Sequence, residues 1–365
     1  MNKFKQPLFH ISKRGDLPWY ISWGVRAGAI VLALVCCGII CTVVTDANPV
    51  GILETIIDGS LGSGRKFMVL LQNTAMLLCV ALALTPAFKM RFWNIGGEGQ
   101  ALAGALAAAA CMILMKNQSS WVVIPCMIIT SILAGALWGA IPAFFKAKFG
   151  TNETLFTLMM NYVAIQLVAY FSVVWENPKG SGNIGVINAN SHVGWFPEIF
   201  GSKYALNIII VILITVAMYI YLNYSKQGYE ISVVGESERT ARYIGIKVEW
   251  VIIRTMIISG AICGLAGLLL VGGTNHTLNA DIVDGRGFTA VLVSWLAKFN
   301  PVWMILTSLL LVFLGRGAGE IATDYGLNAS FGDILTGIIL FFIIGCEFFI
   351  NYKISLTKSF KKEEK

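Results

Sequence analysis

The sequence Arg91-Phe92-Trp93-Asn94-Ile95-Gly96-Gly97-Glu98-Gly99-Gln100, the entrance stretch, lies between two long apolar runs, residues 67–87 and 101–115. Its first part is basic and aromatic, which is typical of a membrane–water interface. Its second part places three glycines, a carboxylate and an amide where the next apolar run begins. Glycine permits a bend, and a carboxylate near lipid depth is costly unless it faces protein, water or a ligand. The stretch therefore predicts a broken helix entrance beside a polar cavity.

The composition indicates an all-α, polytopic integral membrane protein. Of the 365 residues, 56% are hydrophobic and only 13% are charged, and the mean hydropathy is +0.73. Soluble domains carry roughly 25% charged residues, whereas about 20 consecutive apolar residues are enough to span a bilayer. Membrane β-barrels alternate apolar and polar residues. Runs such as 208–221 do not alternate, so helices are favoured.

We expect about ten transmembrane helices between residues 21 and 350, at 21–44, 67–87, 97–115, 121–145, 154–175, 204–223, 251–272, 287–299, 302–314 and 331–350. The first is too long for a cleavable signal-peptide core and reads as a permanent span. The runs 287–299 and 302–314 are short. They either cross the membrane or form a re-entrant hairpin packed inside the protein. Eight and ten crossings both leave the two ends of the chain on one side.

The distribution of charge predicts that both termini are cytoplasmic. Most of the net charge of +7 comes from basic residues in the segments 1–20 and 351–365. Lys and Arg next to membrane spans mark the cytoplasmic side. The loop 225–250 mixes both charges but contains four Lys and Arg residues, whereas the outer loops 45–66 and 176–203 contain two each. This excess is a membrane-topology signal and does not indicate nucleic-acid binding.

The loop 225–250 also predicts a docking element for another protein. Residues 237–244 can form two helical turns, with Ser237 as the N-cap and Gly245 as the terminating residue. A short amphipathic helix on the cytoplasmic face suits docking, although a solvated connector is the alternative. The candidate contact residues are Gly235, Glu238, Arg239, Arg242, Tyr243 and Gly245.

No sequence pattern indicates an enzyme. A G-x-G-x-x-G match at Gly180, Gly182 and Gly185 lies in an outer loop and lacks the strand and helix of a dinucleotide site. No phosphate-cradling Gly-Lys-Ser/Thr loop is present. The three histidines lie in a terminus or in loops, away from a nucleophile at membrane depth. The eight cysteines fall in or beside apolar runs and read as packing residues. We expect no metal site and no bound cofactor.

Polar side chains inside the spans are the candidates for a substrate pathway, namely Asn94, Glu98, Gln100, Glu153 and Asn161. Local roles compete with this interpretation. A helix dipole favours a carboxylate at the first turn, which applies to Glu98 and Glu153. Asn161 lies too deep in its span to be a cap. Trp93 or Tyr162 could stack on a base, although both also suit an interface.

Four blocks of sequence resemble permease subunits of nucleoside-type ABC importers, within the branched-chain amino acid, ribose and nucleoside permease superfamily. The entrance stretch resembles the signature F-N-I-G-x-E-G-Q. Residues 139–153 resemble G-A-x-P-A-x-L-K-A-x-x-G-x-N-E, and residues 159–162 resemble the M-x-N-Y that follows it. Residues 235–246 resemble G-x-N-P-x-A-A-x-Y-A-G-I, and 259–267 form the fourth block. The extra Trp93, Gly97 and the sequence Glu238-Arg239-Thr240 depart from the family pattern, and the last departure affects the docking surface.

The resemblance implies one of two transmembrane subunits of an importer in a bacterial cell membrane. It also implies a cytoplasmic ABC ATPase that binds the ATP and docks at 235–246, a second and paralogous permease subunit, an extracellular substrate-binding lipoprotein and a nucleoside substrate. Three alternative functions remain open, namely a permease for a sugar such as ribose, an ion-coupled secondary transporter, and a membrane scaffold that transports nothing. Secondary transporters often show paired intramembrane carboxylates and repeated broken helices, and only one such signal is evident here.

Overall fold

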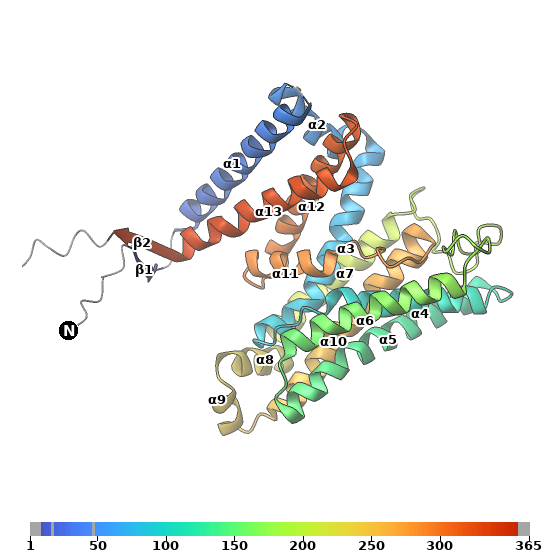
Figure 1. Ribbon diagram of the computed structural model, residues 1–365. Helices are drawn as coiled ribbons and strands as arrows, with labels where there is room; N and C mark the ends of the chain where they lie inside the picture. Colours follow the sequence, from blue (N-terminus) through green and yellow to red (C-terminus); the bar gives the residue numbers. More distant parts are fainter. Residues whose placement is uncertain (1–8, 16–17, 46–47, 357–365) are drawn as a thin grey trace, which may run out of the picture. The chain divides into compact units, whose positions relative to one another are not determined.

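The computed structural model describes residues 9–15, 18–45 and 48–356 (Figure 1). Parts of the predicted terminal segments 1–20 and 351–365 lie outside these residues. The chain divides into two compact units. Unit 1 comprises residues 1–66 and 313–365, and unit 2 comprises residues 67–312. The long helices are α1 (Trp19–Thr45), α3 (Gly64–Lys89), α4 (Gly97–Leu114), α5 (Ser120–Phe149), α6 (Glu153–Val174), α7 (Ala205–Tyr224), α10 (Val248–Leu270), α12 (Pro301–Asp324) and α13 (Ala329–Asn351).

In unit 1, the start of the first span lies beside the end of the last span. Strand β1 (Phe9–Lys13) precedes α1 and pairs antiparallel with β2 (Tyr352–Leu356), which follows α13. Figure 1 shows the two strands together beside the start of α1 and the end of α13. An ion pair of 2.7 Å between Arg26 and Glu347 joins the same ends of the helices. Both ends of the described chain therefore lie on one side, as an even number of crossings requires.

The predicted outer loop 45–66 contains a helix, α2 (Pro49–Leu61), which the sequence analysis treats as loop. Its last turn packs against the end of α12, because Lys66 pairs with Glu320 at 2.7 Å and with Asp58 at 3.1 Å. A Cβ added to Gly59 would lie 2.7 Å from the Cβ of Glu320. The helix was missed because its polar residues interrupt the apolar pattern, whereas tertiary pairing neutralises them.

Unit 2 is built around α3, α4 and α10, the three most buried spans. Helix α5 packs against both α4 and α10, and α6 packs against α4. Small residues permit these close contacts between membrane helices. Gly104 faces the backbone of Gly264, and a Cβ at Gly139 would lie 2.7 Å from the carbonyl oxygen of Met256. A larger side chain at either glycine would separate the helices.

The structure corrects the pair of short spans. Helix α12 runs from Pro301 to Asp324, so the predicted short span 302–314 is a full-length helix that continues through the glycine-rich 315–319 region. The continuation was missed because glycines and charged residues there break the apolar pattern. Gly317 lies against Ile56, with 2.6 Å between its added Cβ and the Ile56 Cγ2. The other predicted short span is truly short, since α11 (Arg286–Leu296) has 11 residues.

Within the described chain, nine helices are long and apolar enough to cross a membrane. The tenth crossing is broken. After α10 comes a π-helical turn, η1 (Val271–Asn275), then an irregular segment, 276–285, and then α11. Ser172, near the end of α6, donates to the Leu278 carbonyl at 3.5 Å, whereas α11 begins beside the first turn of α4. The segment and α11 together therefore travel from one end of unit 2 toward the other.

Candidate functional site

The entrance stretch is a tight, internally bonded turn that starts α4. The Phe92 N–H donates to the Ala87 carbonyl, and Arg91 takes the left-handed conformation with φ of 62°. The Asn94 Oδ1 then accepts from the Gly96 N–H at 3.0 Å. An Asn side chain that bonds the backbone two residues on is a common turn former. The predicted break before α4 is thereby confirmed.

Two amides lock this turn to α10. The Gln100 Nε2 donates to the Asn94 Oδ1 at 3.2 Å, and the Asn94 Nδ2 donates to the Gln100 Oε1 at 3.4 Å and to the Ser259 Oγ at 3.2 Å. Asn94 is 0% exposed and Gln100 is 1% exposed. Buried amides are costly unless they are hydrogen-bonded. Their partners here are all within the chain.

Asn161 ties the same turn to α6. Its Oδ1 accepts from the Gly99 N–H at 2.8 Å, and its Nδ2 donates to the Ile95 carbonyl at 2.9 Å. Thr157, one turn earlier on α6, accepts from the Ile95 N–H at 3.2 Å. Gly99 leaves no room for a side chain, because an added Cβ would lie 2.9 Å from the Asn161 Oδ1. Asn161 therefore satisfies backbone groups that the broken helix leaves unpaired.

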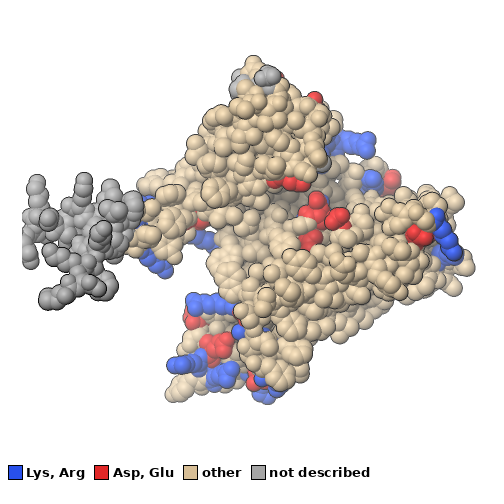
Figure 2. Space-filling model, viewed as in Figure 1, with Lys and Arg blue, Asp and Glu red and all other residues tan. Residues whose placement is uncertain are grey.

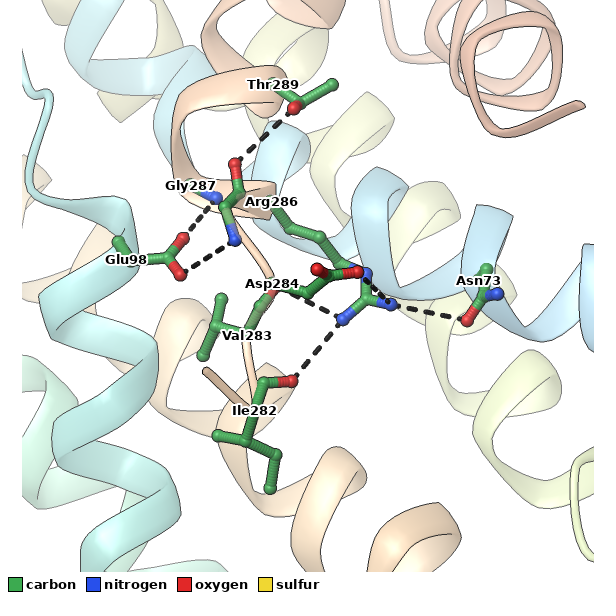
Figure 3. A network of polar contacts seen from close by, with 9 residues as sticks. Asn73, Glu98, Ile282, Val283, Asp284, Arg286, Gly287 and Thr289 are labelled. Atoms are coloured by element: carbon green, nitrogen blue, oxygen red, sulfur yellow. Dashed lines mark hydrogen bonds and ion pairs between the residues drawn. The ribbon is translucent and has the colours of Figure 1, made fainter. Parts of the chain in front are cut away.

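Glu98 binds the beginning of α11 (Figure 3). One carboxylate oxygen accepts from the Gly287 N–H at 2.7 Å and the other from the Gly285 N–H at 3.1 Å. The side chain is only 5% exposed. The N-terminus of a helix presents unpaired N–H groups and a partial positive charge. Glu98 therefore caps a helix that lies 187 residues away along the chain.

Arg286 completes this network, and the sequence analysis does not single it out. Its guanidinium donates to the Asn73 Oδ1 at 3.4 Å and to the Val283 carbonyl at 3.1 Å, and it lies 3.6 Å from a carboxylate oxygen of Asp284 (Figure 3). The arginine thus ties the start of α11 to the middle of α3. A charged residue at the head of a short apolar run was the signal that could have identified it.

Aromatic rings hold the opposite end of α11 against the entrance stretch. The rings of Trp93 and Trp295 stack with 5.3 Å between their centroids. Phe88 contacts both rings at 6.2 Å, and Phe299 lies 5.0 Å from Trp295. Aromatic pairs in this range stabilise beyond the area that they bury. Helix α11 is therefore fixed to residues 93–98 at both ends, by a carboxylate at one and by stacked rings at the other.

The Glu98 carboxylate lies at membrane depth. Its partner α11 begins at Arg286, which contacts Asn73, the tenth residue of the 26-residue α3. Helix α3 is long and apolar enough to cross a membrane. Asn73 is about 14 Å from the nearer end of α3, at 1.5 Å per residue. Since the hydrocarbon layer is about 30 Å thick, both Glu98 and the start of α11 fall within it.

Glu153 lies apart from this cluster. It forms an ion pair of 2.8 Å with Lys146 at the start of α6, where Asn152 caps the helix by accepting from the Leu155 N–H at 3.1 Å. Tyr162 is 56% exposed on α6. The structure thus brings together four of the five predicted pathway residues, Asn94, Glu98, Gln100 and Asn161. Their contact with a solute stays a prediction.

A second polar cluster, at the other end of α10, was missed by the sequence analysis. Thr274 in the π-helical turn accepts from Gln72 at 2.7 Å and from Asn207 at 2.9 Å, and Asn207 also donates to the Leu269 carbonyl at 3.0 Å. The bond from Asn207 satisfies the Leu269 carbonyl, and the other two join α3 and α7 to the Thr274 hydroxyl. Isolated amides in separate spans gave no pattern that linked them.

The predicted helix in the loop 225–250 is confirmed as α9 (Glu238–Tyr243). The Ser237 Oγ accepts from the Thr240 N–H at 3.2 Å, and Gly245 ends the helix with φ of 86°. A further helix that was not predicted, α8 (Lys226–Glu236), precedes it. The candidates Glu238, Arg239, Arg242, Tyr243 and Gly245 are exposed, whereas Gly235 is buried against the Lys89 carbonyl.

Helix α9 is packed onto the entrance stretch and α10 through one buried apolar cluster, which we call the inner cluster. It contains Ala241 of α9, Met90 and Phe92 beside the entrance, and Val248 and Met256 of α10. Close-packed interiors transmit displacement. Figure 2 shows charged side chains gathered over the end of unit 2 where α8 and α9 lie, beside helices covered mainly by other residues.

Comparison with known proteins gives a consistent result. A family model described as "Branched-chain amino acid transport system / permease component" matches residues 67–344. The Guanosine ABC transporter permease protein NupP of Bacillus subtilis is 32% identical over 266 residues, which cover 72% of this chain and 76% of the relative. The Nucleoside ABC transporter permease protein NupB of Lactococcus lactis is 27% identical over 87% of this chain and 89% of the relative. The Glucose ABC transporter permease protein TsgB13 of Haloferax volcanii is 25% identical over 95% of this chain and 93% of the relative.

Proposed function

Because the chain belongs to the branched-chain amino acid transport system permease component family, we propose that it forms the translocation pathway for nucleosides in an ATP-driven importer. The observation that most directly supports this proposal is the 32% identity over 266 residues to a guanosine ABC transporter permease. Nucleosides are neutral and rich in hydrogen-bonding groups. A membrane pathway with amides and carboxylates at depth suits such a solute.

We propose that a separate cytoplasmic ATPase binds the ATP and docks on α8 and α9. Support comes from the exposed charged side chains of α9 and from a surface groove of about 470 Å³ that Arg242, Lys247, Glu249 and Trp250 help to line. Aromatic and Arg side chains are common anchors at such interfaces. On this proposal the termini are cytoplasmic, a paralogous permease subunit completes the membrane part, and an extracellular lipoprotein delivers the solute to the 176–203 side.

The inner cluster supplies the physical link between ATP and the pathway. A shift of α9 moves Ala241 against Met90, Phe92 and Met256, and therefore moves the entrance stretch and the lower part of α10. The entrance stretch holds both ends of α11. Packed helices respond to such a displacement by rigid-body rearrangement. We therefore assign Asn94, Gln100 and Asn161 the role of keeping the bend rigid, so that motion at α9 reaches α11 undiminished.

Uptake measurements test the proposal. Cells that carry this permease with its cognate ATPase and lipoprotein should accumulate radiolabelled guanosine, and unlabelled nucleosides should compete better than ribose or glucose. An ATPase inactivated in its nucleotide site should abolish uptake, whereas a proton uncoupler should not do so while ATP is maintained. Uptake that survives loss of the ATPase but is abolished by the uncoupler would refute ATP-driven import.

A sugar is the second candidate substrate, because a glucose ABC transporter permease is 25% identical over 95% of the chain. The same competition experiment separates the two classes. Preferential inhibition by glucose or ribose would reject the nucleoside while preserving the assignment as an importer subunit. Crosslinking tests the docking site, with cysteines placed one at a time over 238–243. A complete scan that yields no adduct with the ATPase would reject α9 as the contact.

A further inference from the structure

The broken crossing places irregular backbone within the membrane. The segment 276–285 leads into α11, and the Gly285 and Gly287 N–H groups lie 3.1 Å and 2.7 Å from the Glu98 carboxylate. Arg286 marks the depth, because it contacts Asn73, the tenth residue of the 26-residue α3. Irregular backbone at such depth occurs only where protein buries it or where it lines a water-filled cavity.

One face of this crossing is open. Asp284 has 79% of its side chain exposed, Phe288 is 44% exposed and Trp295 is 45% exposed. Phe288 and Trp295 are seven residues apart, which places them on one side of α11, and Asp284 lies in the turn that precedes the helix, with φ of 59°. Between them, the buried residues Gly287, Ala290 and Val293 face the remainder of unit 2. The open face is therefore one stripe, with a carboxylate at its start and aromatic rings along it.

This stripe cannot face lipid. A carboxylate in the hydrocarbon layer costs several kcal/mol unless it reaches water or a polar partner. The partner that Asp284 has, Arg286, lies at 3.6 Å and leaves most of the carboxylate uncovered. Phe288, the first exposed ring of α11, follows Asp284 by four residues. The surface that begins at Asp284 must therefore meet water or another polar surface.

We propose that Asp284, Phe288 and Trp295 line the translocation path and contact the solute. This inference rests on the proposed function for the identity of the solute. The stripe matches a flat heterocycle that carries vicinal hydroxyls. The Phe288 ring offers a face for a base, and Trp295, which stacks on Trp93 with one face, offers its other face. The exposed carboxylate oxygens of Asp284 accept hydrogen bonds from hydroxyl groups, and bonds to a charged acceptor are the stronger kind.

Accessibility to water is the first test, and it does not depend on which solute is carried. Asp284→Cys and Phe288→Cys are each made in the full transporter, together with the control Ile212→Cys. Ile212 lies in the middle of α7 and is 55% exposed, between the values for Phe288 and Asp284. A charged, membrane-impermeant methanethiosulfonate is added to vesicles of both orientations. Peptide mass spectrometry reads each site separately, so the native cysteines can stay.

The Asp284→Cys and Phe288→Cys sites should be modified at least tenfold faster than the Ile212→Cys site from one face of the membrane, because thiolates form in water and not in lipid. Transported solute should slow the modification. Equal, slow modification at all three sites overturns the proposal. Fast modification that no transported solute slows overturns the contact with solute. Protection by glucose but not by guanosine keeps the stripe as the path and rejects the nucleoside as its substrate.

Selective kinetics test the role of the carboxylate. Asp284→Asn keeps the size of the side chain and removes its charge. It should raise KM for guanosine about tenfold, which corresponds to about 1.4 kcal/mol, and leave KM for 2′,3′-dideoxyguanosine unchanged. A merely structural role would change both values together. An equal rise for the two nucleosides therefore refutes contact between Asp284 and the ribose hydroxyls.

Discussion

The contact between Glu98 and the start of α11 gives the sharpest prediction about stability. Glu98→Ala leaves the Gly285 and Gly287 N–H groups without their acceptor, at a side chain that is almost fully buried. A hydrogen bond to a charged group contributes about 1.5–3 kcal/mol. Two such bonds, at 2.7 Å and 3.1 Å, give an expected loss of about 3–6 kcal/mol. Glu98→Gln keeps one acceptor oxygen, so its loss should be about half as large.

Thermal unfolding of the purified transporter measures this loss, with size-exclusion chromatography to follow assembly. A loss of about 3–6 kcal/mol should lower Tm by roughly 10 °C, since 1 kcal/mol shifts Tm by about 2–4 °C for domains of 150–250 residues. Glu153→Gln is the matched control. It also removes a carboxylate at the start of a span, but its ion pair with Lys146 is partly exposed and contributes about 1 kcal/mol or less.

Stability should decrease from wild type to Glu98→Gln and again to Glu98→Ala, and Glu153→Gln should be close to wild type. Gly287→Ala provides an independent perturbation, because its added Cβ would lie 2.7 Å from the Glu98 Cα and would push α11 away. A Glu98→Ala protein that unfolds within a degree or two of wild type would refute the reasoning. So would a Glu153→Gln protein that is as unstable as Glu98→Ala.

Three further predictions follow from particular contacts. Gly264→Leu should abolish assembly, because an added Cβ already meets the backbone of α5, whereas Gly345→Ala, with open space around it, should assemble normally by size-exclusion chromatography. Ser237→Ala should cost α9 about 1 kcal/mol through the lost cap and weaken ATPase binding several-fold in a pull-down titration; unchanged affinity would contradict the docking role. Backbone hydrogen bonds from Gly180 and Gly182 lower the pKa of Glu176. These bonds should therefore keep the loop 176–182 closed at and above the pH range in which carboxyl groups ordinarily titrate. The loop should open as the pH falls through the lowered pKa of Glu176. Intrinsic-rate-corrected hydrogen exchange at these two glycines should rise only below the ordinary pH range of carboxyl titration, and Glu176→Gln should remove the transition.

The Glu176 contact also explains the G-x-G-x-x-G match. Gly180, Gly182 and Gly185 all have positive φ, at 86°, 67° and 68°. Glycine adopts such angles at little cost. The first two direct their N–H groups to a single carboxylate at 2.8 Å and 3.0 Å. The spacing therefore reflects a loop closed on Glu176, and the rejection of a dinucleotide site agrees with this geometry.

Prediction from sequence was most accurate where the determining contacts are local. Apolar run length located the long spans, and the helix capped by Ser237 and ended by Gly245 was found as α9. It was least accurate where a polar residue is neutralised from elsewhere in the chain. Arg26 in α1 was overlooked because Glu347, 321 residues later, removes the cost of its charge. The continuation of α12 past residue 314 was missed in the same way, with Glu320 paired to Lys66.

The entrance stretch shows the same division within ten residues. The sequence by itself determined that α4 begins with a glycine-rich break and a carboxylate, because bending and apolar run length are local properties. Whether Glu98 serves the dipole of its own helix or something else was decided only by the tertiary structure. Its partners lie 187 and 189 residues away, and no pattern in the chain joins them. Folding brings them together because unpaired N–H groups and an unpaired carboxylate are each costly at membrane depth, and each satisfies the other.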